Sequence, residues 1–211
     1  MPRLSPALFL IAALSVPALG AEPVPLFDGK SFAGWEGDTA KTWKVADGVI
    51  TAGSLDATVP RNEFLCTTKT YGDFELKVRF KLEGDKERVN AGVQFRTKRI
   101  PNHHEVSGYQ ADAGQQYWGA LYDESRRNKI LAKPDEKLLA GVVKHGDWNE
   151  YTIRCEGPRI RLWLNGTMTV DYTEADEKVE RTGVIGLQIH GGAKARVSYK
   201  DIRIEELKAG K

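Results

Sequence analysis

Apolar and charged residues alternate without interruption in the segment that follows Asp73. The apolar positions are Phe74, Leu76, Val78, Phe80 and Leu82, and the positions between them are Glu75, Lys77, Arg79 and Lys81. A period of two residues places one set on each face of a β-strand, so this segment predicts a strand with one buried and one solvated side. A helix would scatter the same apolar residues around its whole circumference.

Short segments of the same kind follow one another along the rest of the chain, separated by Gly, Pro and Asn. Asp47–Gly48 and Asn165–Gly166 are typical of tight hairpin turns between strands. Only residues 124–129 and 135–139 resemble helices, and both segments are short and charged. About a dozen short strands in one domain predict a β-sandwich or barrel, and the paired strands with long excursions favour an open sandwich with one curved sheet.

Three of the expected strands, residues 93–96, 108–112 and 187–190, carry an unusual polar face. Its side chains have fixed donor and acceptor geometry: they are Gln94, Arg96, Gln110, Asp112, Gln188 and His190. If these strands share a sheet, the face suits a hydroxyl-rich ligand. The alternative is an ordinary solvated face, which is the default for antiparallel sheets.

The first 20 residues have the order of a secretory signal peptide. Arg3 precedes a short apolar stretch, and Ala18–Leu19–Gly20 offers small residues for cleavage before Ala21. We therefore expect residues 1–20 to be a signal peptide, residues 21–211 to form a single domain, and the protein to be exported, either secreted or periplasmic. The apolar stretch is too short and too Pro-interrupted for a comfortable membrane span.

The charge balance excludes two classes of partner. Without Arg3, 30 Lys and Arg residues face 29 Asp and Glu residues, and no basic block interrupts the chain. Nucleic acid and anionic membranes are therefore not expected partners. Cys66 and Cys155 lie inside expected strands, where either a disulfide or two buried thiols is compatible with an oxidising compartment.

Two carboxylates and a histidine are candidates for acid–base chemistry. Asp112 shares its strand face with Gln110, and Glu124 shares one with Tyr122. Glycoside cleavage generally needs a pair of carboxylates, and His190, followed by two glycines, adds a group that titrates near neutral pH. The structural alternatives are a solvated strand-end carboxylate for Asp112 and a residue in the first turn of a helix for Glu124.

Metal and cofactor binding are not predicted. His103 and His104 are neighbours, but adjacent side chains on an extended chain diverge. No Asp/Asn-rich loop indicates calcium.

Aromatic residues cluster near the same expected sheet edge. Tyr117, Trp118 and Tyr122 offer ring faces for sugar stacking, with core packing as the alternative. Trp118 follows an expected turn, which favours partial exposure. Trp43, Trp148 and Trp163 lie on expected strands and are assigned to the core.

Nine segments distributed along the chain form a recognisable series: Leu26–Lys30 with Gly34–Trp35, Tyr71–Leu76, Asn90–Arg96, Gly108–Asp112, Gly119–Glu124, Trp148–Tyr151, Leu164–Gly166, Gly186–His190 and Lys200–Ile204. In this order they resemble the 3-keto-disaccharide hydrolase domain family. No single motif is specific, but nine motifs in register cover nearly the whole chain from Pro25 to Leu207.

The resemblance implies an all-β, two-sheet antiparallel jelly-roll sandwich of the concanavalin A-like lectin/glucanase type. It also implies an exported enzyme acting on glycosides oxidised at the sugar C3, supplied by a separate sugar 3-oxidoreductase. A ketone at C3 acidifies the C2 proton, so a base can remove it and expel the C1 substituent before water adds. The implied roles are Asp112 or His190 as base, Glu124 as acid, and Arg96 with Gln188 or Gln110 around the enolate oxygen, while Gln94, Trp118 and Tyr122 would contact substrate.

Two other functions remain open at this point. The same fold and the lack of a motif tied only to catalysis are compatible with a carbohydrate-binding module. An adhesion or scaffold domain, with the polar face merely solvated, is the third hypothesis.

Overall fold

The computed structural model describes residues 22–208, in which the chain forms 15 strands and one short helix. The segment assigned to a signal peptide, residues 1–20, lies outside the described residues. Within the described part, no helix is long and apolar enough to cross a membrane.

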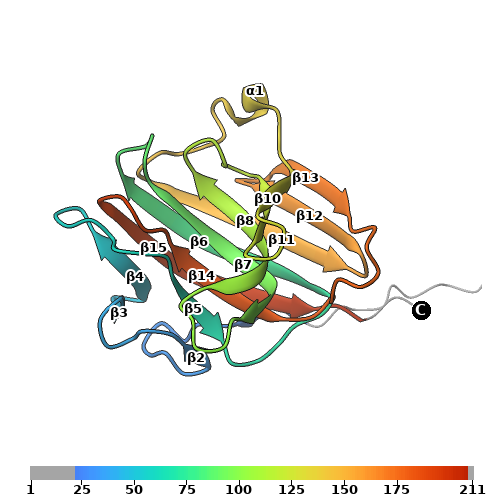
Figure 1. Ribbon diagram of the computed structural model, residues 1–211, viewed down its shortest axis with the longest axis horizontal. Helices are drawn as coiled ribbons and strands as arrows, with labels where there is room; N and C mark the ends of the chain where they lie inside the picture. The colour runs from blue at the N-terminus through green and yellow to red at the C-terminus, as the bar shows by residue number, and fades with distance from the viewer. Residues whose placement is uncertain (1–21, 209–211) are drawn as a thin grey trace, which may run out of the picture.

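The strands form two antiparallel sheets that lie face to face (Figure 1). Sheet A contains, in spatial order, β13 (Thr167–Thr173), β12 (Arg159–Leu164), β11 (Trp148–Glu156), β6 (Phe74–Gly84), β15 (Ala195–Glu206), β4 (Val49–Ser54) and β3 (Trp43–Ala46), with β1 (Val24–Pro25) paired to β15. Sheet B contains β10 (Lys129–Ala132), β9 (Leu121–Glu124), β8 (Val106–Gly114), β7 (Asn90–Arg99), β14 (Val184–Ile189), β5 (Glu63–Thr67) and β2 (Trp35–Glu36). The helix α1 (Glu136–Leu139) projects from one end of the sandwich.

Both expected hairpin turns are present. Asp47 and Gly48 have φ values of 52° and 76°, and Asn165 and Gly166 have values of 49° and 81°. Two successive residues with positive φ give the turn that matches the twist of the flanking strands, which is why Asn or Asp followed by Gly occurs here. These turns join β3 to β4 and β12 to β13.

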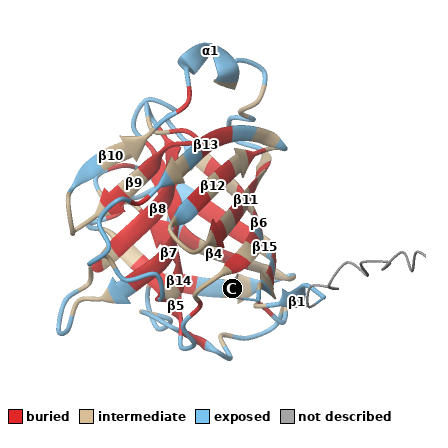
Figure 2. Cartoon of the chain, turned by 90° about the vertical axis from the view of Figure 1, so that its right-hand side faces the viewer, coloured by how far each residue is buried: buried red, intermediate tan, exposed pale blue. Residues whose placement is uncertain are grey.

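The alternating pattern of β6 has the predicted consequence. Phe74, Leu76, Val78, Phe80 and Leu82 are all buried against the inner face of sheet B, whereas the residues between them lie on the outer face of sheet A. The core between the sheets is continuous, as the buried residues in Figure 2 show. The all-β, two-sheet sandwich predicted from the sequence is therefore confirmed.

Some local expectations were wrong. Residues 124–129 do not form a helix, because the chain turns back at Ser125 and Asn128, both with positive φ, and continues as β10. The backbone N–H of Asn128 donates to the carbonyl oxygen of Asp123 and closes this turn. Residues 135–139 do include a single helical turn, capped by the Asp135 side chain.

The expectation that three tryptophans lie in the core was correct for one of them. Trp43 lies in the core, but Trp148 and Trp163 are half-buried on the outer face of sheet A.

Cys66 and Cys155 are both buried free thiols, and they belong to different sheets. Burial raises the pKa of Cys66 to about 11 and that of Cys155 to about 12, so both thiols stay protonated and unreactive.

Candidate functional site

The outer face of sheet B carries a layer of buried polar side chains. Four amides form this layer, which we call the amide floor: Asn90, Gln94, Gln110 and Gln188. The strand register places Gln94 opposite both Gln110 and Gly186, and Gly92 opposite both Asp112 and Gln188, so these positions share one face. The alternate residues of the same strands, such as Val93 and Leu187, point into the core. The polar face expected from alternation therefore exists, but it is buried rather than solvated.

A chain of hydrogen bonds runs across the floor and ends on Asp112. The Gln94 amide donates to Gln110 Oε1, the Gln110 amide donates to Asp112, and Asn90 Nδ2 donates to Asp112 Oδ1 at 2.7 Å. Gly92 makes room for this arrangement, because a Cβ added there would lie 2.6 Å from Gln110 Cδ. The side-chain amides of Asn90 and Gln110 both donate to Asp112, so they fix the position of its carboxyl group.

Asp112 is nonetheless poised between its two protonation states. Burial raises its pKa from 3.8 to about 7, with a further contribution from the negative charge of Glu124. The hydrogen bonds from Asn90 and Gln110 act in the opposite direction, since they stabilise the carboxylate. At neutral pH this carboxyl can therefore either give or accept a proton.

Glu124 lies on the neighbouring strand β9, and its pKa is raised in the same sense. Burial and then the charge of Glu105 raise it from 4.5 to about 7. Gln188 Nε2 lies 3.5 Å from Glu124 Oε2, although β14 and β9 are separated by two strands. The floor side chains of the two strands thus converge, and the two carboxyls belong to one site.

The loops beside the floor bring in His190 and Glu105. Asn62 accepts a hydrogen bond from the backbone N–H of Gly191 at 3.0 Å and donates to Glu105 Oε1 at 3.1 Å. This side chain joins the segment after β14 to the loop between β7 and β8. His190 is half-buried next to this link, with its Nδ1 2.7 Å from the Gly191 carbonyl oxygen.

Two core tyrosines from sheet A support the floor from below. The Tyr199 hydroxyl lies 3.0 Å from the carbonyl oxygen of Gly92 and 2.7 Å from that of Gln188. The Tyr151 hydroxyl contacts the carbonyl oxygen of Asp112 and accepts from the N–H of Gly119 at 3.0 Å. Because both hydroxyls are fully buried, they hold the strands under the reactive carboxyl in fixed positions.

Tyr122 stands at the edge of the floor. It is half-buried, its ring meets Tyr117 edge-on with centroids 6.2 Å apart, and burial together with the charge of Glu124 raises its pKa. Its position opposite Gln110 in the register places its side chain on the floor side of β9.

Arg96 does not join this group. It adopts a φ of 45° where the register between β7 and β8 shifts, so its side chain leaves the floor. The guanidinium is held by Asp73 at 2.8 Å and by the carbonyl oxygens of Gly72 and Gly157 at 2.9 and 2.7 Å. A bulge reverses the side-chain alternation, and strand parity alone cannot foresee it.

Trp118 is likewise placed in the core rather than at the surface. Only 6% of the residue is exposed, and its ring stacks on Phe80 with centroids 6.2 Å apart. Its ring face is therefore already occupied by a core residue of sheet A.

Three residues of the site escaped the sequence reasoning. Asn90 lies four residues before Gln94 and shares its parity, so a longer reading of the alternation would have found it. Asn62 and Glu105 come from loops, where no periodicity indicates direction.

The site presents acceptors that have no donor. Within residues 22–208, Gln94 Oε1, Gln188 Oε1 and Glu105 Oε2 are buried and make no hydrogen bond. In the same range, no Lys or Arg forms an ion pair with Asp112, Glu124 or Glu105, and no group of three or more His, Cys, Asp or Glu residues is arranged to hold a metal ion. The unpaired acceptors can recognise hydrogen-bond donors such as hydroxyls, and the two carboxyls can transfer protons.

Known structures share this architecture. The chain is similar to a glycosyl-hydrolase-like protein from Parabacteroides distasonis, with a TM-score of 0.63 and 20% identity over 87% of this chain and 93% of that one. It is also similar to the carbohydrate binding module CBM66 from Bacillus subtilis, with a TM-score of 0.63 and 15% identity over 82% and 95% of the two chains. A β-glucanase from Bacillus licheniformis gives a TM-score of 0.56 and 10% identity over 87% and 97%. At these identities the likeness shows the fold, a jelly-roll sandwich of the concanavalin A-like type.

Sequence comparison identifies the family. No protein of the curated set matches the chain. The family described as the 3-keto-alpha-glucoside-1,2-lyase-like domain matches residues 22–205, which is most of the chain. The protein therefore belongs to the 3-keto-alpha-glucoside-1,2-lyase-like domain family.

Proposed function

We propose that this protein is an exported carbohydrate-active enzyme that cleaves the glycosidic bond of 3-keto-glycosides by acid–base chemistry on the outer face of sheet B. One observation carries the proposal: Asp112 and Glu124 lie in one site and both have a pKa of about 7. A general acid or base works best when its pKa lies near the working pH. Two such groups on a floor of fixed amides are more than a saccharide-binding surface needs.

The reaction matches the residues available. A ketone at C3 makes the C2 proton acidic, so a carboxylate can remove it without assistance from a metal. The electron pair left on C2 forms the C1–C2 double bond as the C1–O bond breaks, and the departing oxygen takes a proton from the acid. Addition of water to the resulting enone at C1 then gives net hydrolysis.

We assign Asp112 or His190 as the base and Glu124 as the acid. We assign the amide group of Gln110 or Gln188 as the donor for charge that develops on the C3 oxygen. Arg96, which the sequence suggested for that role, is held at the end of the sandwich by Asp73, Gly72 and Gly157. Gln94 and Tyr122 remain candidates for substrate contact.

The required substrate implies a preceding step. A 3-keto-glycoside arises by two-electron oxidation of the C3 hydroxyl, so a separate sugar 3-oxidoreductase would supply it.

The decisive experiment compares a 3-keto-glucoside with its unoxidised parent. The purified protein should release the C1 substituent of the ketone and leave the parent intact. Asp112→Asn and Glu124→Gln should each reduce turnover by roughly 10²–10⁴-fold while the protein stays folded. Glu150→Gln, a change of the same kind on the outer face of sheet A, is the matched control and should keep full activity.

A carbohydrate-binding module is the second candidate. The unpaired acceptors Gln94 Oε1 and Gln188 Oε1 and the likeness to module CBM66 favour it. If the protein binds the glycoside in calorimetry yet leaves both substrates intact at every pH tested, binding is its function and the enzyme proposal fails.

A further inference from the structure

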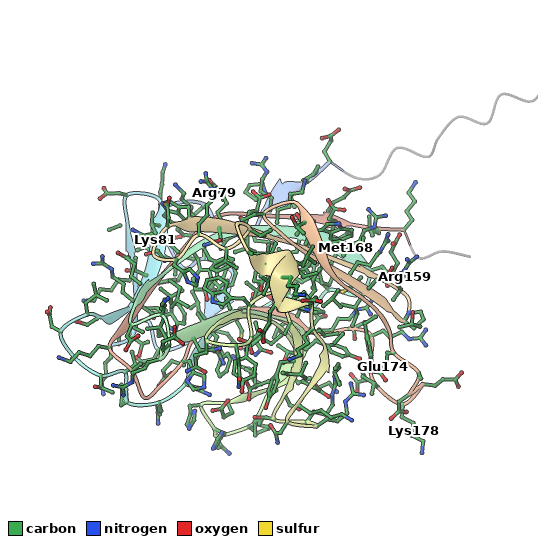
Figure 3. All side chains as sticks on the ribbon, turned by 90° about the horizontal axis from the view of Figure 1, so that it is seen from above. Arg79, Lys81, Arg159, Met168, Glu174 and Lys178 are labelled. Atoms are coloured by element: carbon green, nitrogen blue, oxygen red, sulfur yellow. The ribbon has the colours of Figure 1, made fainter. Side chains whose placement is uncertain are left out.

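The outer face of sheet A carries a compact group of cations far from the amide floor. Its members lie on the two central strands β6 and β15, and we call them the cationic patch: Lys77, Arg79, Lys81, Lys200 and Arg203. Figure 3 shows Arg79 and Lys81 projecting together from one side of the molecule, opposite the side where Glu174 and Lys178 are labelled. The patch lies on the outer face of sheet A and the amide floor on the outer face of sheet B, so the patch is separate from the residues of the proposed function.

Like charges face each other directly across the two strands. The register pairs Arg79 with Lys200 and Lys77 with Arg203. Directly opposed like charges destabilise a sheet, whereas Glu83 and Arg196 show that opposite charges can face each other across the same two strands. Two adjacent pairs of like charge therefore indicate a requirement other than stability.

The neutralisation of the patch is incomplete. Asp201 lies 3.4 Å from Arg79, and Glu83 lies 3.3 Å from Lys81, but Glu83 is shared with Arg196 at 2.9 Å. Among the described residues, neither Lys200 nor Arg203 takes part in an ion pair. These two cations are available to an anionic group from outside.

The ring of Trp148 lies among three cations of the patch. Lys200 Nζ lies 4.2 Å from the centroid of its ring, and Arg79 and Lys81 each lie 5.8 Å away. The ring attracts all three cations through its negative face. They are gathered at one point, where a single acidic group can contact more than one of them.

Carboxylates border the patch. On the outer face of β6, Glu75 and Glu83 lie at the two ends of the run of three cations, and Glu150 lies on the next strand opposite Arg79. Glu75 is 3.8 Å from Lys77, the first cation of the run. The run from Lys77 to Lys81 spans roughly 13 Å at the usual rise of a strand. The surface therefore fits a narrow anionic chain that crosses the sheet, rather than a broad one.

We infer that the cationic patch binds a short stretch of an acidic polysaccharide through its carboxylate groups. An anionic membrane is disfavoured because a flat surface would also meet the bordering carboxylates. A single-stranded nucleic acid is disfavoured because Lys200 covers the Trp148 ring, which then offers no platform for base stacking. The inference is independent of the chemistry proposed for sheet B.

Affinity electrophoresis of the full-length protein in gels containing polygalacturonate tests this inference, with neutral dextran as the reference polymer. Lys200→Gln combined with Arg203→Gln should weaken binding by about tenfold, because neither cation is neutralised by an ion pair among the described residues; within the fold, Lys200→Gln loses the contact with the Trp148 ring. Lys200→Arg combined with Arg203→Lys keeps both charges and should retain binding. Lys133→Gln combined with Lys178→Gln removes the same charge elsewhere on the surface and is the matched control.

Binding should weaken as salt is raised, because exposed charges are screened. The inference is overturned if polygalacturonate does not retard the protein, if dextran retards it equally, or if the control pair weakens binding as much as the patch pair. Binding of polyglutamate, oligothymidylate or phosphatidylglycerol vesicles without binding of polygalacturonate would assign the patch to another partner and also overturn it.

Discussion

Replacement of Asp112 by Asn should remove most of the pH dependence of stability near neutrality. The carboxyl is buried, and burial raises its pKa from 3.8 to about 7. Between these two values the folded protein keeps a proton that the unfolded chain releases. The free energy of unfolding therefore falls as pH rises through this window.

The size of the effect follows from the two values. A rise from 3.8 to about 7 corresponds to about 4 kcal/mol. This contribution is fully present below pH 3.8 and is lost above about pH 7. The amide of the Asp112→Asn variant carries no charge at any pH, so this variant should overtake the wild type in stability on the alkaline side.

Glu124 has the same sign, since its pKa is also raised to about 7, but it is half-exposed and contributes less. Glu174 acts elsewhere: although burial opposes the change, hydrogen bonds from Arg127 and Tyr109 lower its pKa to about 2. Its stabilisation has the opposite sign: it is present above pH 4.5 and is lost as pH falls toward about 2, so the two windows overlap only between pH 3.8 and 4.5.

Urea unfolding followed by tryptophan fluorescence, at several pH values between about 4 and 9, measures this directly. The wild-type free energy of unfolding should decrease across the range, and that of Asp112→Asn should change far less. Asp56→Asn, an exposed carboxylate in the loop after β4, is the control and should follow the wild type. A wild-type stability that is constant or increases from about pH 4 to 8 would refute the reasoning, because it would mean that Asp112 is ionised in the fold.

The remaining predictions concern other parts of the chain. Trp118→Ala should cost roughly 3–5 kcal/mol of stability, since the ring packs on Phe80. A variant as stable as the wild type would instead support an exposed, sugar-stacking Trp118. Glu105→Gln should lower the pKa of Glu124, because it removes the negative charge that raises this pKa most, and one limb of the activity–pH profile should move to lower pH. An unchanged profile would show that the charge of Glu105 does not influence Glu124. N-terminal sequencing of the native protein should begin at or near Ala21, and retention of the first residue would refute cleavage.

The strands of this fold could be predicted because their information is local. A strand that is buried on one side must alternate, as β6 does, and a two-residue hairpin loop must accept positive φ, as Asn165–Gly166 does. The same parity argument brought Gln94, Gln110, Asp112 and Gln188 to one face. It also exposed the limit of parity, because one bulge at Arg96 was enough to turn a side chain away from its neighbours.

The parts that could not be predicted depend on contacts between distant segments. Whether a tryptophan beside a turn is exposed depends on the opposite sheet, and here Phe80 of β6 covers Trp118. Glu105 raises the pKa of Glu124, and it is held in the loop between β7 and β8 by Asn62, which comes from a third segment. The local sequence around these residues does not indicate that they contact each other in the fold.

The burial of the amide floor has the same origin and matters most for function. In the sequence the polar alternation of β7, β8 and β14 is also compatible with a solvated face, and solvated carboxyls keep their ordinary pKa. In the fold, Gln94, Gln110 and Gln188 are less exposed than many core residues, and Tyr199 fixes the backbone beneath them. Water is thereby kept from Asp112, and the loss of solvation is the largest cause of its raised pKa. The property that makes this carboxyl a candidate catalyst is thus produced by the packing of the whole sandwich, and not by the residues on its own strand.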